Sequence, residues 1–124
     1  EDEWSVSFEV SDEFITRFVK SKDALSDLET FTVETRDGFH GEELVFTVGT
    51  NITNTIEFIV EATVNESFEA VPFDSNLMKE ILKANKDYHS GEIRINKKGL
   101  LDAHFHCGDD LYTGYYLVRK QENN

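Results

Sequence analysis

The hydrophobic residues follow the same pattern of spacings in the two halves of this chain. When the second half is set 63 positions after the first, the segment 5–10 falls on 68–73 and Ser11 falls on Asp74; both are common N-cap residues. Apolar pairs four residues apart, the spacing of one helix face, then coincide as well. These pairs are Phe14-Ile15 and Phe18-Val19 in the first half and Leu77-Met78 and Ile81-Leu82 in the second. The pattern predicts a strand followed by an amphipathic helix in each half.

Three further strands are predicted after each helix. With a slip of one residue, alternation starts again at Phe31 in the first half and at Ile93 in the second, and it ends near a glycine turn at 36–38 or 97–99. Two more β-rich segments follow each turn: 43–48 and 56–62 in the first half, and 103–107 and 112–119 in the second. Sequence identity between the halves is low, so the repeat is one of pattern.

The predicted elements define the fold class. We expect an α+β fold in a single domain, residues 1–124, made of two strand-helix-three-strand units at about 5–64 and 68–120. A duplicated unit usually forms a pseudo-twofold domain, so antiparallel sheets with two adjacent helices on one face are expected. With 124 residues, 39% of them hydrophobic, the chain can bury a core without disulfides.

Cysteine usage and the start of the chain bear on location. The single cysteine, Cys107, permits no internal disulfide, which favours a reducing, intracellular setting. No stretch is apolar enough to cross a membrane, and the acidic start Glu1-Asp2-Glu3-Trp4 is unlike a signal peptide. Because the initiator Met is missing, we expect a processed or excised piece.

Charge is distributed unevenly along the chain. The net charge of −13 argues by itself against nucleic-acid binding, because an acidic surface repels phosphates. The helical segments 11–25 and 74–89, however, hold six bases and six acids, whereas the other 93 residues hold six bases and nineteen acids. Since the acids of these segments lie mostly in first and last turns, the middle of each predicted helix is mainly positive.

The predicted helices contain six candidate nucleic-acid contacts: Arg17, Lys20, Lys22, Lys79, Lys83 and Lys86. Those of the second helix follow at i, i+4 and i+7, opposite its apolar residues, whereas Lys22 points nearer the apolar side. In one amphipathic helix, such bases are usually no more than a solvated face. Here both halves concentrate bases on the helix and acids elsewhere, so adjacent helices would form a positive face on an acidic body.

This order of elements and placement of charge resembles the DNA sliding clamps, the polymerase processivity factors, over residues 6–120. The best local similarity is at 71–84 (VPFDSNLMKEILKA), which looks like a clamp's aromatic strand end, polar cap and Leu-rich helix ending in bases. The segments 91–95 (GEIRI), 99–101 (GLL) and 115–120 (YYLVRK) look like the end of a clamp's last domain. Size and acidity are most similar to clamps of T4-like bacteriophages.

The resemblance implies a function as well as a fold. Paired helices of clamp domains line a ring around duplex DNA, so the six helix bases would contact phosphates weakly and without base recognition. It implies a non-enzymatic part of a homo-oligomeric ring, without cofactor or metal, that tethers a replicative DNA polymerase and is placed by a clamp loader. The expected location is the cytoplasm, of the host cell for a phage protein. Because clamp subunits contain two or three such domains, we expect this one to be the C-terminal domain of a longer subunit.

One cluster suggests a metal-dependent enzyme instead. His104 and His106 are two residues apart in a predicted strand, so they project from one face and could chelate Zn²⁺, with His40, His89 or a carboxylate completing the site. Third and fourth ligands at recognisable spacing are missing, and a strand whose alternate residues pack inward explains the same pattern. The paired acids Asp109-Asp110 also leave a Ca²⁺ contact open.

Two tripeptides match the acceptor pattern for N-glycosylation, at 51–53 (NIT) and 65–67 (NES). They leave open a third interpretation: an acidic, β-rich interaction domain, extracellular or on a virion, whose helices are merely structural. Glycan on Asn51 or Asn65 in material from the native source would exclude a cytoplasmic clamp.

Overall fold

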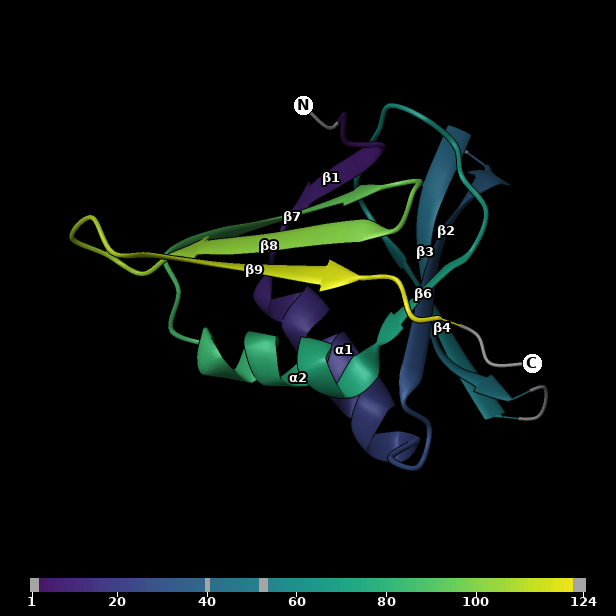
Figure 1. Ribbon diagram of the computed structural model, residues 1–124, viewed down its shortest axis with the longest axis horizontal. Coiled ribbons are helices and arrows are strands. Elements are labelled where there is room, and N and C mark those ends of the chain that lie inside the picture. The colour runs from purple at the N-terminus through teal and green to yellow at the C-terminus, as the bar shows by residue number, and fades with distance from the viewer. Residues whose placement is uncertain (1–2, 40, 52–53, 122–124) are drawn as a thin grey trace.

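The computed structural model describes residues 3–39, 41–51 and 54–121, with the backbone alone at Thr50 and Asn51. Two helices and nine strands occur in this part of the chain (Figure 1). Their order is β1 (Val6–Glu9), α1 (Asp12–Ala24), β2 (Thr30–Gly38), β3 (Gly41–Asn51), β4 (Asn54–Val60), β5 (Thr63–Val64), β6 (Val71–Asp74), α2 (Ser75–Ala84), β7 (Ser90–Asn96), β8 (Leu100–His106) and β9 (Tyr112–Val118). The fold is therefore α+β, as the sequence predicts.

The strands form two antiparallel sheets. One has the order β5-β1-β7-β8-β9 and the other β4-β3-β2-β6. In each sheet, three strands that are consecutive in sequence lie side by side: β2, β3 and β4 in one sheet, and β7, β8 and β9 in the other. The strand beside them comes from the other half of the chain, where it precedes that half's helix. Thus β1 pairs with β7, and β6 pairs with β2. Each sheet is therefore completed by a strand from the other half of the chain.

Both helices begin at the predicted caps. The Ser11 hydroxyl accepts a hydrogen bond from the Phe14 amide at 3.0 Å, and the Asp74 carboxylate accepts from Asn76 and Leu77 at 2.8 and 3.0 Å. These oxygens satisfy amides that the first helical turn leaves without partners. Asp74 is the last residue of β6 and Ser11 comes two residues after β1, so the strands that pair with the other half fix where both helices start. The helices lie side by side, in contact with strands β2, β3 and β4 of the four-stranded sheet and below β7, β8 and β9 in the view of Figure 1.

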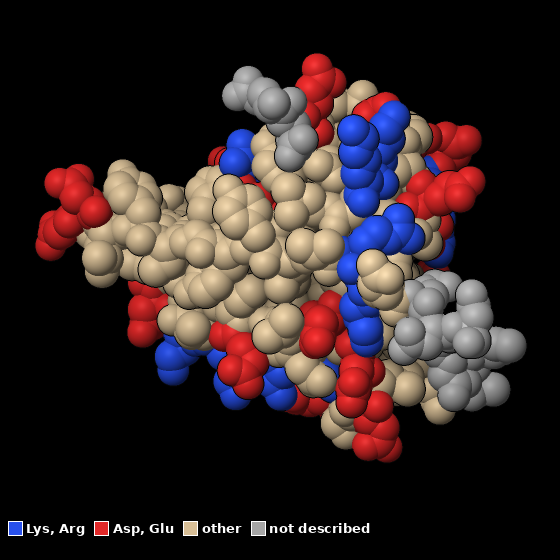
Figure 2. All heavy atoms as spheres, viewed as in Figure 1, with Lys and Arg blue, Asp and Glu red and all other residues tan. Residues whose placement is uncertain are grey.

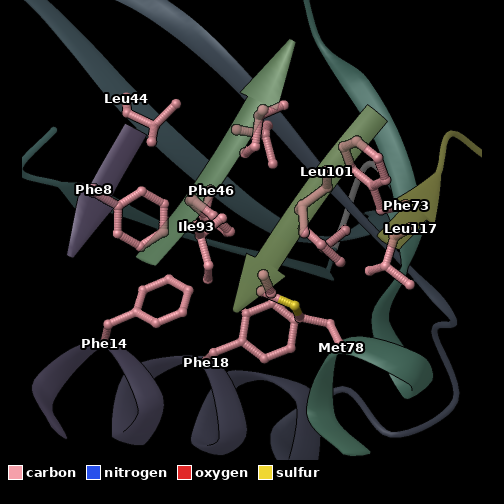
Figure 3. Packing of buried hydrophobic residues seen from close by; sticks show 14 of the residues in the cluster. Phe8, Phe14, Phe18, Leu44, Phe46, Phe73, Met78, Ile93, Leu101 and Leu117 are labelled. Atoms are coloured by element: carbon pink, nitrogen blue, oxygen red, sulfur yellow. The ribbon is translucent and has the colours of Figure 1, made fainter. Parts of the chain in front are cut away.

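One hydrophobic core joins the helices to both sheets. Phe14 and Phe18 project from α1, and Met78 from α2, into the same cluster of strand residues (Figure 3). Phe18 packs edge to face on Phe31 of β2, with ring centroids 5.0 Å apart. The stripe on α2 is narrower than its sequence suggests, because Leu77 is 52% exposed. No helix in the described part of the chain is long and apolar enough to cross a membrane.

This packing predicts a large difference between two truncations. Phe18→Ala removes a fully buried ring from the centre of the core and should lower the free energy of unfolding by about 3–5 kcal/mol. Leu77→Ala, on the solvent side of α2, should lower it by about 0.5 kcal/mol or less. Urea unfolding followed by circular dichroism measures both values. Equal losses would contradict the core described here.

Candidate nucleic-acid interface

An ion pair joins the two helices on the side away from the core. The Lys79 ammonium of α2 donates a hydrogen bond to the Asp23 carboxylate near the end of α1. This bond, together with the nearby charge of Lys83, holds the pKa of Asp23 below its ordinary value. The stabilisation is therefore present above the ordinary pKa of 3.8 and is lost as the pH falls through the lower pKa of the folded chain.

The first helix presents two of its three bases at the surface. Arg17 is paired with Glu13, one turn earlier, at 2.7 Å, and Lys20 is exposed. Lys22 is different, because its side chain is only 3% exposed and its ammonium donates to the Ser26 carbonyl at 2.8 Å. The expected DNA contact at Lys22 is therefore wrong. Its position near the apolar stripe buries the stem and directs the charge to the chain just beyond α1.

The three bases expected on the second helix lie at or near the surface, but Lys86 falls two residues beyond the end of α2 at Ala84. Lys83 and Lys86 are exposed, and Lys79 is partly covered by its pairing with Asp23. A shallow hollow on the outer side of α2 is lined by Lys79 and Lys83 together with Glu80. The helix face thus carries both signs, as the mixed charges below α2 in Figure 2 show. Among the described residues, the side chains of Lys20, Lys83 and Lys86 form no hydrogen bond or ion pair.

A second basic group lies away from the helices and was not expected. It consists of the β7–β8 turn and the residues just after β9: Lys97, Lys98, Arg119 and Lys120. Figure 2 shows a column of Lys and Arg over the end of β9. The two segments meet because Leu100 pairs with Val118 in the β8–β9 hairpin. Periodicity alone does not reveal this group, since its two parts are far apart in sequence; a correct hairpin register would have done so.

Close backbone contacts build this basic group. The Asn96 side-chain oxygen accepts from the amides of Lys98 and Leu100, both at 3.1 Å, which fixes the turn. Gly99 has a φ of +104°, and a side-chain carbon there would lie 2.5 Å from Arg119 Cδ. The Arg119 amide also donates to the Gly99 carbonyl at 2.8 Å. Glycine therefore permits the close approach that brings the turn and the chain end together.

Two members of the basic group are engaged with protein. The Lys97 ammonium lies 2.6 Å from Glu66 and lowers the pKa of that carboxyl by hydrogen bonding. The Lys120 ammonium donates to the Thr30 hydroxyl at 2.8 Å, a neutral partner. The side chains of Lys98 and Arg119 have no partner among the described residues.

The predicted histidine pair is committed to other contacts. His104 Nδ1 lies 3.1 Å from Asp102 and Nε2 lies 3.3 Å from Glu92, whereas His106 stacks on Tyr112 with ring centroids 4.7 Å apart. The described residues contain no group of three or more His, Cys, Asp or Glu that could hold a metal ion. His40 lies outside these residues. The structure thus lends no support to a Zn²⁺ site at His104.

The glycosylation tripeptides are described only in part. Asn65 is exposed and its amide donates to the Trp4 carbonyl at 3.2 Å, whereas Ile52-Thr53 and the side chain of Asn51 lie outside the described residues.

Comparison of the chain with protein families and with curated proteins finds no match.

Proposed function

We propose that this chain is a domain of a DNA sliding clamp, a non-enzymatic, homo-oligomeric ring that encircles duplex DNA and tethers a replicative polymerase. The observation that carries the proposal is the topology, in which two sheets complete each other and set two helices side by side. A clamp loader and the polymerase are the protein partners that this function requires. The proposal places the protein in the cytoplasm and needs no cofactor, because topological linkage replaces catalysis.

The sheet orders support an internal duplication. Read from one edge, β4-β3-β2-β6 corresponds strand for strand to β9-β8-β7-β1. The connections beyond the edge strands correspond as well: β5 follows β4 and pairs with β1, and the Lys120 amide, just after β9, donates to the Pro72 carbonyl of β6 at 2.9 Å. Such a domain has a pseudo-twofold arrangement, in which both helices face one way.

The helix face supports weak, sequence-independent DNA contact. Lys20 of α1, Lys83 of α2 and Lys86, just beyond α2, are exposed cations that form no ion pair in the described part of the chain. They can meet phosphates directly or through water, and neither contact reads base sequence. The acids on the same helices keep the attraction modest, which suits a protein that must slide.

The edges of the two sheets suggest how copies assemble. β4 and β9 are edge strands, and backbone groups of such strands can pair with another chain. Residues 29–70, around β4, contain nine acids and one base, whereas residues 90–121, around β9, contain four acids and five bases. Charge therefore favours pairing β9 of one copy with β4 of the next over pairing like edges, and such head-to-tail contacts can close a ring.

An extracellular or virion interaction domain stays the second candidate, because Asn65 of one acceptor tripeptide is exposed. The glycan analysis of native material decides between the two.

The first prediction concerns the helix face. The isolated chain should bind duplex DNA weakly, with a Kd of about 10⁻⁶ M or above, without sequence preference, and less tightly as salt increases. Lys83→Gln with Lys86→Gln removes two phosphate contacts and should reduce the slope of log K against log salt by about 2. Fluorescence anisotropy with a labelled duplex measures the slope. Lys79 is left unchanged because it holds Asp23.

A matched control for this lysine variant changes the net charge by the same amount at positions elsewhere. Ala70→Glu with Thr63→Glu also makes the net charge more negative by two, at exposed positions outside the helices. This control should leave the salt slope unchanged. An equal effect of both pairs, or tight sequence-specific binding by the original chain, would contradict the proposal.

The second prediction concerns the β9 edge. The Arg119 amide donates to the Gly99 carbonyl, which continues the ladder of hydrogen bonds between β9 and β8. Because amides of an antiparallel strand point alternately to its two sides, the Tyr116 amide points to the free edge of β9. Tyr116→Pro should therefore keep the fold but weaken self-association by about tenfold or more, whereas Tyr116→Ala keeps the amide and should associate normally. Sedimentation velocity over a range of concentrations compares them. Unchanged association of a folded Tyr116→Pro variant would show that this edge is not used.

A further inference from the structure

The outer face of the five-stranded sheet carries exposed aromatic residues. Tyr112, Tyr116 and Val118 of β9 are 67%, 66% and 72% exposed, whereas the intervening Leu117 is buried. Tyr115 also points inward, where its hydroxyl accepts from the Asn85 amide at 3.0 Å. In Figure 2 a broad uncharged surface covers β8 and β9, which is unusual for a chain in which 30% of residues are charged.

The two tyrosines flank an open position. Gly114 lies between them on the same face, and a side-chain carbon there would meet only His104 Cβ, at 4.0 Å. Residues four apart in a strand are separated by about 13 Å, so flat groups can enter beside either ring. Tyr112 is held in place by stacking on His106, at an interplanar angle of 20°. The face therefore offers two exposed tyrosine rings with a glycine between them, beside His104 on the neighbouring strand.

Cations lie at one end of this face. Val118 leads directly to Arg119 and Lys120, and the β8–β9 register sets the Lys98 turn beside them. None of these three side chains is paired with a carboxylate in the described part of the chain. Three positive groups beside an uncharged, aromatic surface suit a ligand that has both negative charges and flat rings.

Of the acids on the same face, Asp102 is paired with a cation, Glu92 lies 3.3 Å from His104 Nε2 in the middle of the face, and Asp109 and Asp110 are distant from the cations. Asp102 accepts from Arg94 at 2.7 and 3.0 Å and lies beside His104. The Arg94 guanidinium in turn stacks over the Trp4 ring, 4.7 Å from its centroid. Asp109 and Asp110 occupy the tip of the β8–β9 hairpin, at the opposite end from the cations, as the acidic tip in Figure 2 shows. Repulsion of an anion is therefore concentrated away from the cationic end.

We propose that this outer sheet face binds single-stranded nucleic acid, with bases stacked on Tyr112 and Tyr116 and phosphates at Lys98, Arg119 and Lys120. Base stacking on exposed aromatic residues beside a positive track is the usual physical basis of single-strand binding. A duplex hides the faces of its bases and could use only the cations. The proposal is independent of the clamp function, which uses the helix face.

Fluorescence anisotropy with a labelled thymidine oligomer of about 12 nucleotides at low salt tests this inference. Tyr116→Ala should weaken binding by about fivefold or more, which corresponds to the loss of at least one stacked base. Lys98→Gln with Arg119→Gln should reduce the slope of log K against log salt by about 1.4. The matched-charge control Ala70→Glu with Thr63→Glu should reproduce the affinity of the original chain.

Two results with the original chain and the tyrosine variants would overturn the inference. In the first, the folded original chain shows no detectable binding of the oligomer at low salt. In the second, Tyr116→Ala and Tyr112→Ala both bind the oligomer with the affinity of the original chain, because the cations alone would then account for binding. The same titrations with the double variant Lys83→Gln and Lys86→Gln separate the two proposals. If this variant binds the duplex more weakly but keeps its affinity for the oligomer, both proposals are supported. If it loses affinity for both ligands equally, the oligomer binds at the helix face and the inference is overturned.

Discussion

The exchange of strands between the two halves is the constraint on which the rest of this structure depends. Backbone hydrogen bonds hold β1 beside β7 and β6 beside β2, so neither sheet is complete without the other half. Each exchanged strand leads directly into a capped helix, and the exchange therefore brings both helices to one side of the molecule. The core between them and the Lys79–Asp23 ion pair outside follow from this placement.

The same arrangement separates the molecule into surfaces with different physical properties. In a chain of net charge −13, cations without a carboxylate partner mark where an anion can approach. Such cations occur on the helices and at the end of β9, but their surroundings differ. The helix bases lie among acids on a polar surface, whereas the β9 group borders a face with two exposed tyrosines. The first setting suits passing contact with phosphates, and the second suits contact with bases as well.

Local patterns in the sequence predicted the helices, their caps and most strands, because these depend on spacing over a few residues. Three features depend on tertiary contacts and could not be predicted in this way. Lys22 is near the edge of the apolar stripe, and only the chain beyond α1 decides that its ammonium is buried against Ser26. Leu77 fits the stripe by spacing but lies beyond the reach of the core. The meeting of Lys98 with Arg119 requires the register of the β8–β9 hairpin.

The central claim is that unpaired cations define two separate nucleic-acid surfaces on one acidic domain. Mapping of backbone amide shifts by NMR, with a duplex and with a thymidine oligomer added in turn, tests it most directly. The account predicts that the duplex shifts amides around Lys20, Lys83 and Lys86, and that the oligomer shifts those around Tyr112, Tyr116 and Arg119. One common set of shifted amides for both ligands, or shifts spread evenly over the domain, would contradict it.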